Sequence, residues 1–138
     1  MNQREIYITE FDLARLRDVL SARLSAGARD RDHLESLEHE LDRAHVVDPS
    51  AVPHDVITMN SQVRIEDVDT GMENVYTLVF PSDAGIQDKK LSILAPIGTA
   101  LLGARAGETV DWPVPAGVRT VRIKAVLYQP EAAGDFHL

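Results

Sequence analysis

The spacing of apolar residues changes once along this chain, near residue 48, and divides the sequence into a helical part and a β-rich part. The first helical series has spacings of 3, 4 and 4 and consists of Leu13, Leu16, Leu20 and Leu24. A second series has spacings of 3, 4 and 3 and consists of Leu34, Leu37, Leu41 and Ala44. Beyond Pro53 apolar and polar residues alternate, which is typical of strands with one buried face.

The two helical series predict an antiparallel hairpin over residues 1–47, joined by a short glycine-containing turn. Thr9 is the expected N-cap of the first helix, because acidic residues follow it in the first turn. Asp30 or Asp32 would cap the second helix, which should end near Val46. Each helix has about 14–17 residues, or about 21–26 Å. The narrow apolar seam predicts a short coiled coil that one chain can satisfy, so we expect a monomer.

Residues 48–53 read D-P-S-A-V-P, and their prolines predict a stiff linker. The remaining residues, 54–138, predict a β-rich domain. Its expected elements are strands at 61–68, 74–80, 91–95 and 118–128, a strand in the run G-E-T-V-D-W-P-V-P, and one short helix at 96–103. The residues after 128 show no period and predict no element. The fold class is therefore α+β, a helical hairpin followed by a β-rich domain.

Charge and composition narrow the class of partner. Residues 1–50 carry 7 basic and 11 acidic side chains and residues 51–138 carry the same numbers, so each half has a net charge of −4. Direct binding to nucleic acid is disfavoured, since it depends on neutralising phosphates. A protein with a basic surface is the better expectation. Cysteine is absent, and neither a signal peptide nor an apolar run long enough to span a membrane is found, so we expect a cytoplasmic protein.

The residue types needed for catalysis do not form a recognisable motif. His33, His39 and His45 recur every six residues on the second predicted helix. Neighbouring members therefore lie about 120° apart around the helix axis and cannot share one metal ion. We expect these histidines to face solvent. No serine has the sequence context of a nucleophile. The sequence predicts no catalytic residue, no bound metal and no cofactor.

Two aspartates, Asp30 and Asp32, stand at the predicted tip of the hairpin, one residue apart. Carboxylates are the oxygen ligands that Mg²⁺ favours. An acidic, solvated turn is the simpler explanation, because aspartate is common at turns and helix N-caps. Residue types alone leave both interpretations open.

The run S-I-L-A-P-I-G-T-A-L-L-G, a P-A-G turn and a final V-L-Y strand follow the predicted hairpin. This combination resembles the Gre transcript-cleavage factors over nearly the whole chain. The resemblance implies an FKBP-like C-terminal domain without isomerase activity, docked at the rim of the secondary channel of bacterial RNA polymerase. It also implies that the hairpin enters the channel, where acidic tip residues of the cleavage factors help to hold a second Mg²⁺.

Two departures from the Gre pattern alter this expectation. The predicted helices are about half as long as those of the cleavage factors, so Asp30 and Asp32 would stop short of the metal. We expect a solvated tip or one that touches basic residues inside the channel, because coordination needs contact at about 2 Å. The docking loop of the cleavage factors usually reads Asp-Ser-Pro, and the matching residues are Leu94, Ala95 and Pro96. Docking through these residues and Ile97 is the expectation.

The function predicted from the sequence is a non-enzymatic regulator that binds RNA polymerase at the secondary channel and competes with cleavage factors. Two alternatives stay open. The stretches P-H-D-V-I-T-M-N-S-Q-V and Y-Q-P-E-A-A-G-D resemble a short-hairpin member whose name refers to nucleoside diphosphate kinase, which implies control of that enzyme by direct contact. An FKBP-like prolyl isomerase is disfavoured, because the seven aromatic residues, with Trp112 the sole tryptophan, are scattered along the chain.

Overall fold

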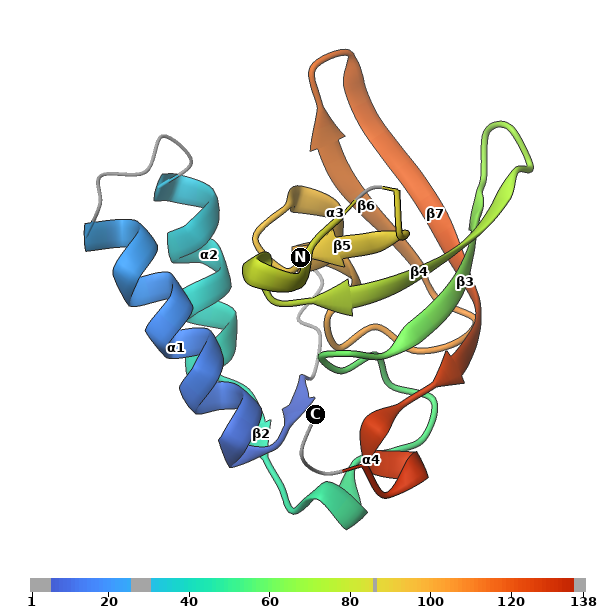
Figure 1. Cartoon of the computed structure of the whole chain (residues 1–138). Helices are drawn as coiled ribbons and strands as arrows, with labels where there is room; N and C mark the ends of the chain where they lie inside the picture. The colour runs from blue at the N-terminus through green and yellow to red at the C-terminus, as the bar shows by residue number, and fades with distance from the viewer. Residues whose placement is uncertain (1–5, 26–30, 86, 136–138) are drawn as a thin grey trace.

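The computed structural model describes residues 6–25, 31–85 and 87–135 of the 138-residue chain. Helices α1 (Glu10–Ser25) and α2 (Arg31–Asp42) lie side by side on one flank, and a curled β-sheet forms the other (Figure 1). The fold is therefore α+β, as the sequence predicted. None of the helices in the described ranges combines the length and apolar composition needed to cross a membrane.

The leucines of the two helical series form the seam between α1 and α2. Five of them are at most 2% exposed: Leu16, Leu20, Leu34, Leu37 and Leu41. Thr9 caps α1, because its Oγ1 accepts a hydrogen bond from the backbone N–H of Asp12 at 3.2 Å. The predicted burial of these leucines and the predicted N-cap are both confirmed.

The C-terminal end of α2 differs from the prediction. The helix begins at Arg31, so Asp32 lies in its first turn and not at its N-cap, while Asp30 lies outside the described residues. It ends at Asp42 instead of near Val46. The chain there forms strand β2 (His45–Val46), which pairs in parallel with β1 (Tyr7–Ile8). Two-residue strands are too short to show a hydrophobic period, which is why the sequence predicted neither.

The sheet has five strands in the order β5-β4-β3-β7-β6. Its members are β3 (Gln62–Asp67), β4 (Glu73–Val79), β5 (Lys90–Ser92), β6 (Thr109–Val114) and β7 (Gly117–Tyr128). β4 and β5 are parallel and all other neighbours are antiparallel. The predicted β3–β4 hairpin is confirmed, whereas β5 ends at Ser92 and is shorter than expected. Two register shifts between β3 and β7 add to the curl of the sheet.

One hydrophobic core joins the hairpin to the sheet. It contains the seam leucines together with Val63 and Ile65 of β3, and Val121 and Ile123 of β7. The base of the hairpin is thus packed on the β-rich part and does not stand free. The short helix α3 (Pro96–Leu101) was predicted at this place in the sequence, and its residue Leu101 is fully buried in the same core.

Three short helical elements were not predicted, one of which is the 3₁₀ helix η2 (Pro81–Asp83) that follows β4. The proline-containing segment expected as a stiff linker contains the 3₁₀ helix η1 (Pro49–Ala51). After β7 the chain forms α4 (Pro130–Ala133), so the β-rich part holds two short α-helices where the sequence predicted one. Pro130 stands at the first position of α4, and Gly134 ends it with a φ of 81°. Four residues are too few for a helical period to be read from the sequence.

Candidate functional site

The predicted docking loop, Leu94 to Ile97, connects β5 to α3. Pro96 is exposed, Ala95 and Ile97 are half-buried, and Leu94 is only 6% exposed. Ile97 packs against the hydrophobic core, so only part of its side chain is open to a partner. Pro96 is therefore the most exposed of the four residues and the one most accessible to a partner.

Short backbone contacts fix the shape of this loop. The N–H of Ala95 donates to the carbonyl of Ser92 at 3.1 Å, and the N–H of Leu94 donates to the Ser92 Oγ at 3.1 Å. The N–H of Thr99 donates to the carbonyl of Ala95 at 2.9 Å and begins the hydrogen-bond ladder of α3. A Cβ at Gly98 would lie 2.1 Å from the Ser92 carbonyl oxygen. Glycine is therefore required where α3 crosses the end of β5.

A groove of about 630 Å³ runs between α1 and the 3₁₀ helix η2 (Pro81–Asp83), with the docking loop at its edge. The residues that line it are Arg15, Asp18, Val19, Ala22, Arg23, Phe80, Pro81, Ser82, Asp83 and Leu94. Apolar side chains from both the hairpin and the β-rich part thus meet in one hollow, flanked by charges of both signs. The groove was not predicted, because its walls come from segments about 60 residues apart.

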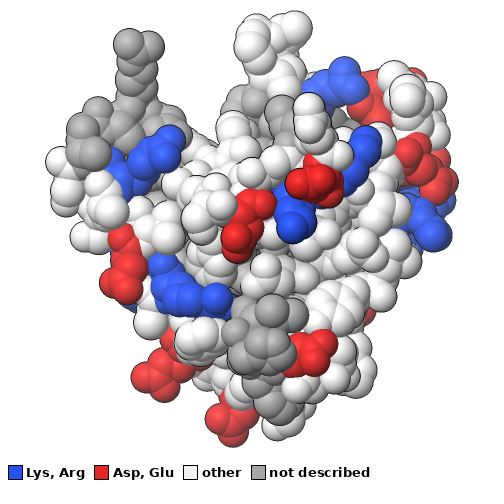
Figure 2. All heavy atoms as spheres, viewed as in Figure 1, with Lys and Arg blue, Asp and Glu red and all other residues white. Residues whose placement is uncertain are grey.

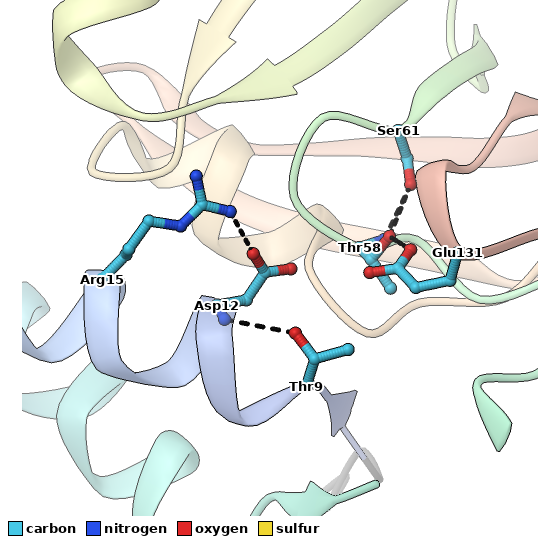
Figure 3. A network of polar contacts seen from close by, with 6 residues as sticks. All are labelled: Thr9, Asp12, Arg15, Thr58, Ser61 and Glu131. Atoms are coloured by element: carbon cyan, nitrogen blue, oxygen red, sulfur yellow. Dashed lines mark hydrogen bonds and ion pairs between the residues drawn. The ribbon is translucent and has the colours of Figure 1, made fainter. Parts of the chain in front are cut away.

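Arg15 bridges the hairpin and the β-rich part. Its guanidinium carbon lies 4.0 Å from the ring centre of Phe11 and 4.5 Å from that of Phe80, so two aromatic rings flank it. The same guanidinium donates a hydrogen bond to the carboxylate of Asp12, which is 3% exposed (Figure 3). Burial raises the pKa of Asp12 to about 6, while the hydrogen bond and charge of Arg15 act in the opposite direction.

A second polar group ties α4 to the start of the sheet. The hydroxyl of Thr58 donates to the carboxylate of Glu131 at 2.7 Å, and the N–H of Thr58 donates to Ser61 Oγ at 3.0 Å (Figure 3). The negative charge of Glu131 adds to the raised pKa of Asp12. Asp12 is hydrogen-bonded to Thr9 and Arg15 of its own segment, and Glu131 to Thr58; nothing in these contacts suggests catalysis.

The three histidines that were predicted on the second helix have different surroundings, and His45 lies in β2. His39 is exposed, and His45 is exposed and stacks on Tyr7 with ring centres 5.1 Å apart. His33, in contrast, is half-buried, and its Nε2 lies 3.2 Å from the carbonyl oxygen of Leu94 and 3.1 Å from Thr99 Oγ1. The expectation that His33 faces solvent was wrong. No sequence signal links residues 61 and 66 positions apart.

The acidic tip is described only in part. Asp32 is exposed in the first turn of α2, and Asp30 lies outside the described residues. Within residues 6–25, 31–85 and 87–135, no three His, Cys, Asp or Glu side chains are grouped so that they could hold a metal ion.

Basic and acidic side chains are interspersed on the face of the molecule drawn in Figure 2. Several charged side chains of the protein form cross-strand or interhelical pairs, for example Arg17 with Asp42 at 3.1 Å and Arg122 with Glu66 at 3.8 Å. A mixed-sign surface of this kind suits contact with another protein better than contact with the phosphate backbone of a nucleic acid.

Comparison with known proteins connects this geometry to a family. Residues 52–128 match the family described as "Transcription elongation factor, GreA/GreB, C-term". Residues 4–47 match the family described as "Rnk N-terminus".

Individual relatives agree with both matches. The chain is 40% identical to the "Regulator of nucleoside diphosphate kinase" of Escherichia coli strain K12, over the full length of both chains. It is 33% identical to the transcription elongation factor GreA of Thermodesulfovibrio yellowstonii, over 70% of this chain and 61% of that one. A solved GreA/GreB elongation factor from Nitrosomonas europaea has 43% identity and a TM-score of 0.75, covering 90% of this chain and all of that one. The chain belongs to the GreA/GreB family of transcription elongation factors, within which it carries an Rnk N-terminus.

Proposed function

We propose that this protein is a non-enzymatic regulator that binds RNA polymerase at the secondary channel and competes there with cleavage factors. In this proposal the β-rich part is an FKBP-like docking domain, residues 54–138, and residues 1–47 are a short coiled coil that enters the channel. The linker between them is residues 48–53. The GreA relatives are named as transcription elongation factors, which supports RNA polymerase as the partner.

The length of the hairpin is the observation that carries the proposal. α1 has 16 residues and α2 has 12, which corresponds to about 24 and 18 Å at 1.5 Å per residue. Helices of about twice this length are expected for a factor whose tip reaches the metal of the polymerase. A short hairpin occupies the channel without delivering carboxylates to the active centre, so the protein acts by occupancy.

The docking loop supplies the contact with polymerase in this proposal. Pro96 is exposed at the first turn of α3, and Leu94 borders the apolar groove beside α1. An exposed proline on a rigid loop loses little conformational entropy on binding. The groove and the loop together give a partner one continuous surface, built from both the hairpin and the β-rich part.

A substitution at Pro96 tests the docking loop. Pro96→Asp places a charge in the contact, yet an acidic residue suits the first turn of a helix, so the fold should be retained. We expect this variant to bind purified core RNA polymerase at least tenfold more weakly than wild type, measured by fluorescence anisotropy.

Met72→Asp is the matched control, because Met72 is a 64% exposed apolar residue on the β3–β4 turn. It should bind polymerase like wild type. Equal binding by Pro96→Asp and wild type would place the docking contact elsewhere.

A second candidate function is direct control of nucleoside diphosphate kinase. The relative with 40% identity over its full length is named as a regulator of that enzyme, and this observation favours the candidate. Affinity measurements with purified kinase and purified core polymerase, side by side, separate the two. Binding to the kinase alone would favour direct control, and binding to polymerase alone would favour an effect through transcription.

A prolyl isomerase is the least supported function. An isomerase site of the FKBP type would need a deep pocket lined with aromatic residues. Among the ten described residues that line the groove beside α1, Phe80 is the one aromatic residue. Trp112 lies on β6, away from this groove.

A further inference from the structure

The side chain of His33, on the hairpin, makes polar contact with the docking loop. The Nε2 atom of this half-buried residue lies 3.2 Å from the Leu94 carbonyl oxygen and 3.1 Å from Thr99 Oγ1. His33 lies in the first turn of α2, Leu94 is the first residue of the docking loop, and Thr99 lies in α3. The histidine therefore spans the start of the loop and the helix that follows it.

The contacts determine which ring nitrogen carries hydrogen. A carbonyl oxygen can only accept, so Nε2 must donate to Leu94. The hydroxyl of Thr99 donates its own hydrogen to the carbonyl of Ile93 at 2.8 Å, so it too accepts from Nε2. His33 thus holds a hydrogen on Nε2 and shares it between two oxygen atoms. The imidazolium form also carries this hydrogen and preserves both contacts.

The Leu94 carbonyl depends on a partner from outside the loop. The ladder of α3 begins one residue later, where the Thr99 N–H donates to Ala95. The Leu94 N–H is directed to the Ser92 side chain within β5. His33 supplies the donor for the Leu94 carbonyl oxygen. This contact fixes the peptide plane that joins Leu94 to Ala95.

We propose that His33 is a positioning residue for polymerase docking: the second helix of the hairpin sets the conformation of the loop from Leu94 to Ile97. This inference rests on the proposed function. It means that the docking site is completed by the hairpin and is not a property of the β-rich part alone. A partner seated on the loop is then coupled to the hairpin that enters the channel.

Three variants of the full chain test the role of the donor. His33→Phe keeps a ring of similar size and removes the hydrogen-bond donor. His33→Gln keeps an N–H donor at a similar distance from the backbone. His39→Phe is the matched control, because His39 is exposed on the same helix. Thermal unfolding monitored by circular dichroism verifies that each variant is folded.

Two measurements follow for each variant: the dissociation constant for core RNA polymerase, and hydrogen–deuterium exchange of residues 92–99 in the free protein. We expect His33→Phe to bind about threefold to tenfold more weakly, as one net hydrogen bond implies, and to exchange faster in this segment. His33→Gln should recover most of the affinity for polymerase and most of the protection from exchange. His39→Phe should match wild type in both measurements.

The outcomes separate this inference from the proposed function. If wild type binds polymerase and His33→Phe binds equally well with unchanged exchange, His33 has no positioning role. Weaker binding that His33→Gln does not restore would also overturn the role of the donor. If wild type does not bind polymerase, the proposed function fails, and unchanged exchange in His33→Phe would then overturn this inference separately.

Discussion

Asp12 is a buried carboxylate at the junction of the hairpin and the β-rich part, and its environment opposes the charged form. Burial raises its pKa from 3.8 to about 6, although Arg15 lies against it. Arg15 in turn is flanked by Phe11 and Phe80, so its stem and ring contacts contribute packing as well as charge. Removing either Asp12 or Arg15 would leave the other charged group, which is buried or half-buried, without this partner, and that is destabilising.

The raised pKa predicts a dependence of stability on pH. Between about pH 4 and pH 6, the folded protein holds a proton on Asp12 that the unfolded chain has released. The contribution of Asp12 to the free energy of unfolding therefore falls as pH rises through this range. Between about pH 4 and pH 6, the free energy of unfolding of wild type should therefore fall by up to about 3 kcal/mol relative to that of Asp12→Asn. This value follows from about 1.4 kcal/mol per pKa unit.

Urea denaturation at several pH values measures this difference. Asp18→Asn, which removes an exposed carboxylate from the same helix, is the matched control for loss of charge. A stability difference between wild type and Asp12→Asn that stays constant from pH 4 to pH 7 would contradict the role assigned to Asp12.

Among the elements, α1 and α2 depend most on a few large side chains. Leu20 is 1% exposed in the seam. Leu20→Ala should lower the free energy of unfolding by about 2–5 kcal/mol, because it removes buried methyl groups and leaves a cavity. Thermal unfolding measures the change, with Ser21→Ala as an exposed control one position away. A loss no larger than that of the control would mean that the seam contributes little to stability.

Elements with a long hydrophobic period could be predicted from the sequence, and short ones could not. The alternation in β3, β4 and β7 gave their positions to within two residues, and Pro96 and Gly103 bracketed α3. The strands β1 and β2 have two residues each and exist because each supplies the other's hydrogen bonds. No local pattern reports such pairing.

The candidate site shows the same limit. The docking loop could be found because its residues are contiguous in sequence. The groove, the rings around Arg15 and the contact of His33 with Leu94 depend on tertiary packing across the two parts of the chain. The position of His33 in the sequence is typical of a histidine on a helix surface. Its partners come from the approach of α3 to α2. The partial burial of Ile97 has the same origin.

At the scale of the molecule, the hairpin and the sheet share one core, so the hairpin is held in a fixed direction relative to the docking loop. Its reach is set by helix length, which no local substitution extends. We therefore predict that the protein does not stimulate transcript cleavage in stalled polymerase complexes at any Mg²⁺ concentration, whereas a GreA protein used as positive control does. The readout is the length of radiolabelled transcripts on a gel.

The double variant Asp30→Asn with Asp32→Asn is tested both for transcript cleavage and for binding to core RNA polymerase. Its docking affinity should stay within about tenfold of wild type, since an exposed charge pair usually contributes no more than about 1 kcal/mol. A larger, salt-dependent loss would favour contact of the tip with basic residues in the channel. Transcript cleavage by wild type that disappears in the double variant would contradict the non-enzymatic proposal.

The proposal that this protein binds the secondary channel in place of cleavage factors is tested by competition with GreA for core RNA polymerase. Fluorescently labelled GreA is bound to core polymerase, and unlabelled protein is titrated in while anisotropy is followed. We predict full displacement of GreA by the wild-type protein, with a midpoint that follows the protein's own dissociation constant. The Pro96→Asp variant should displace GreA only at much higher concentrations. Binding of the protein to polymerase that leaves labelled GreA in place, as a ternary complex, would contradict the proposal.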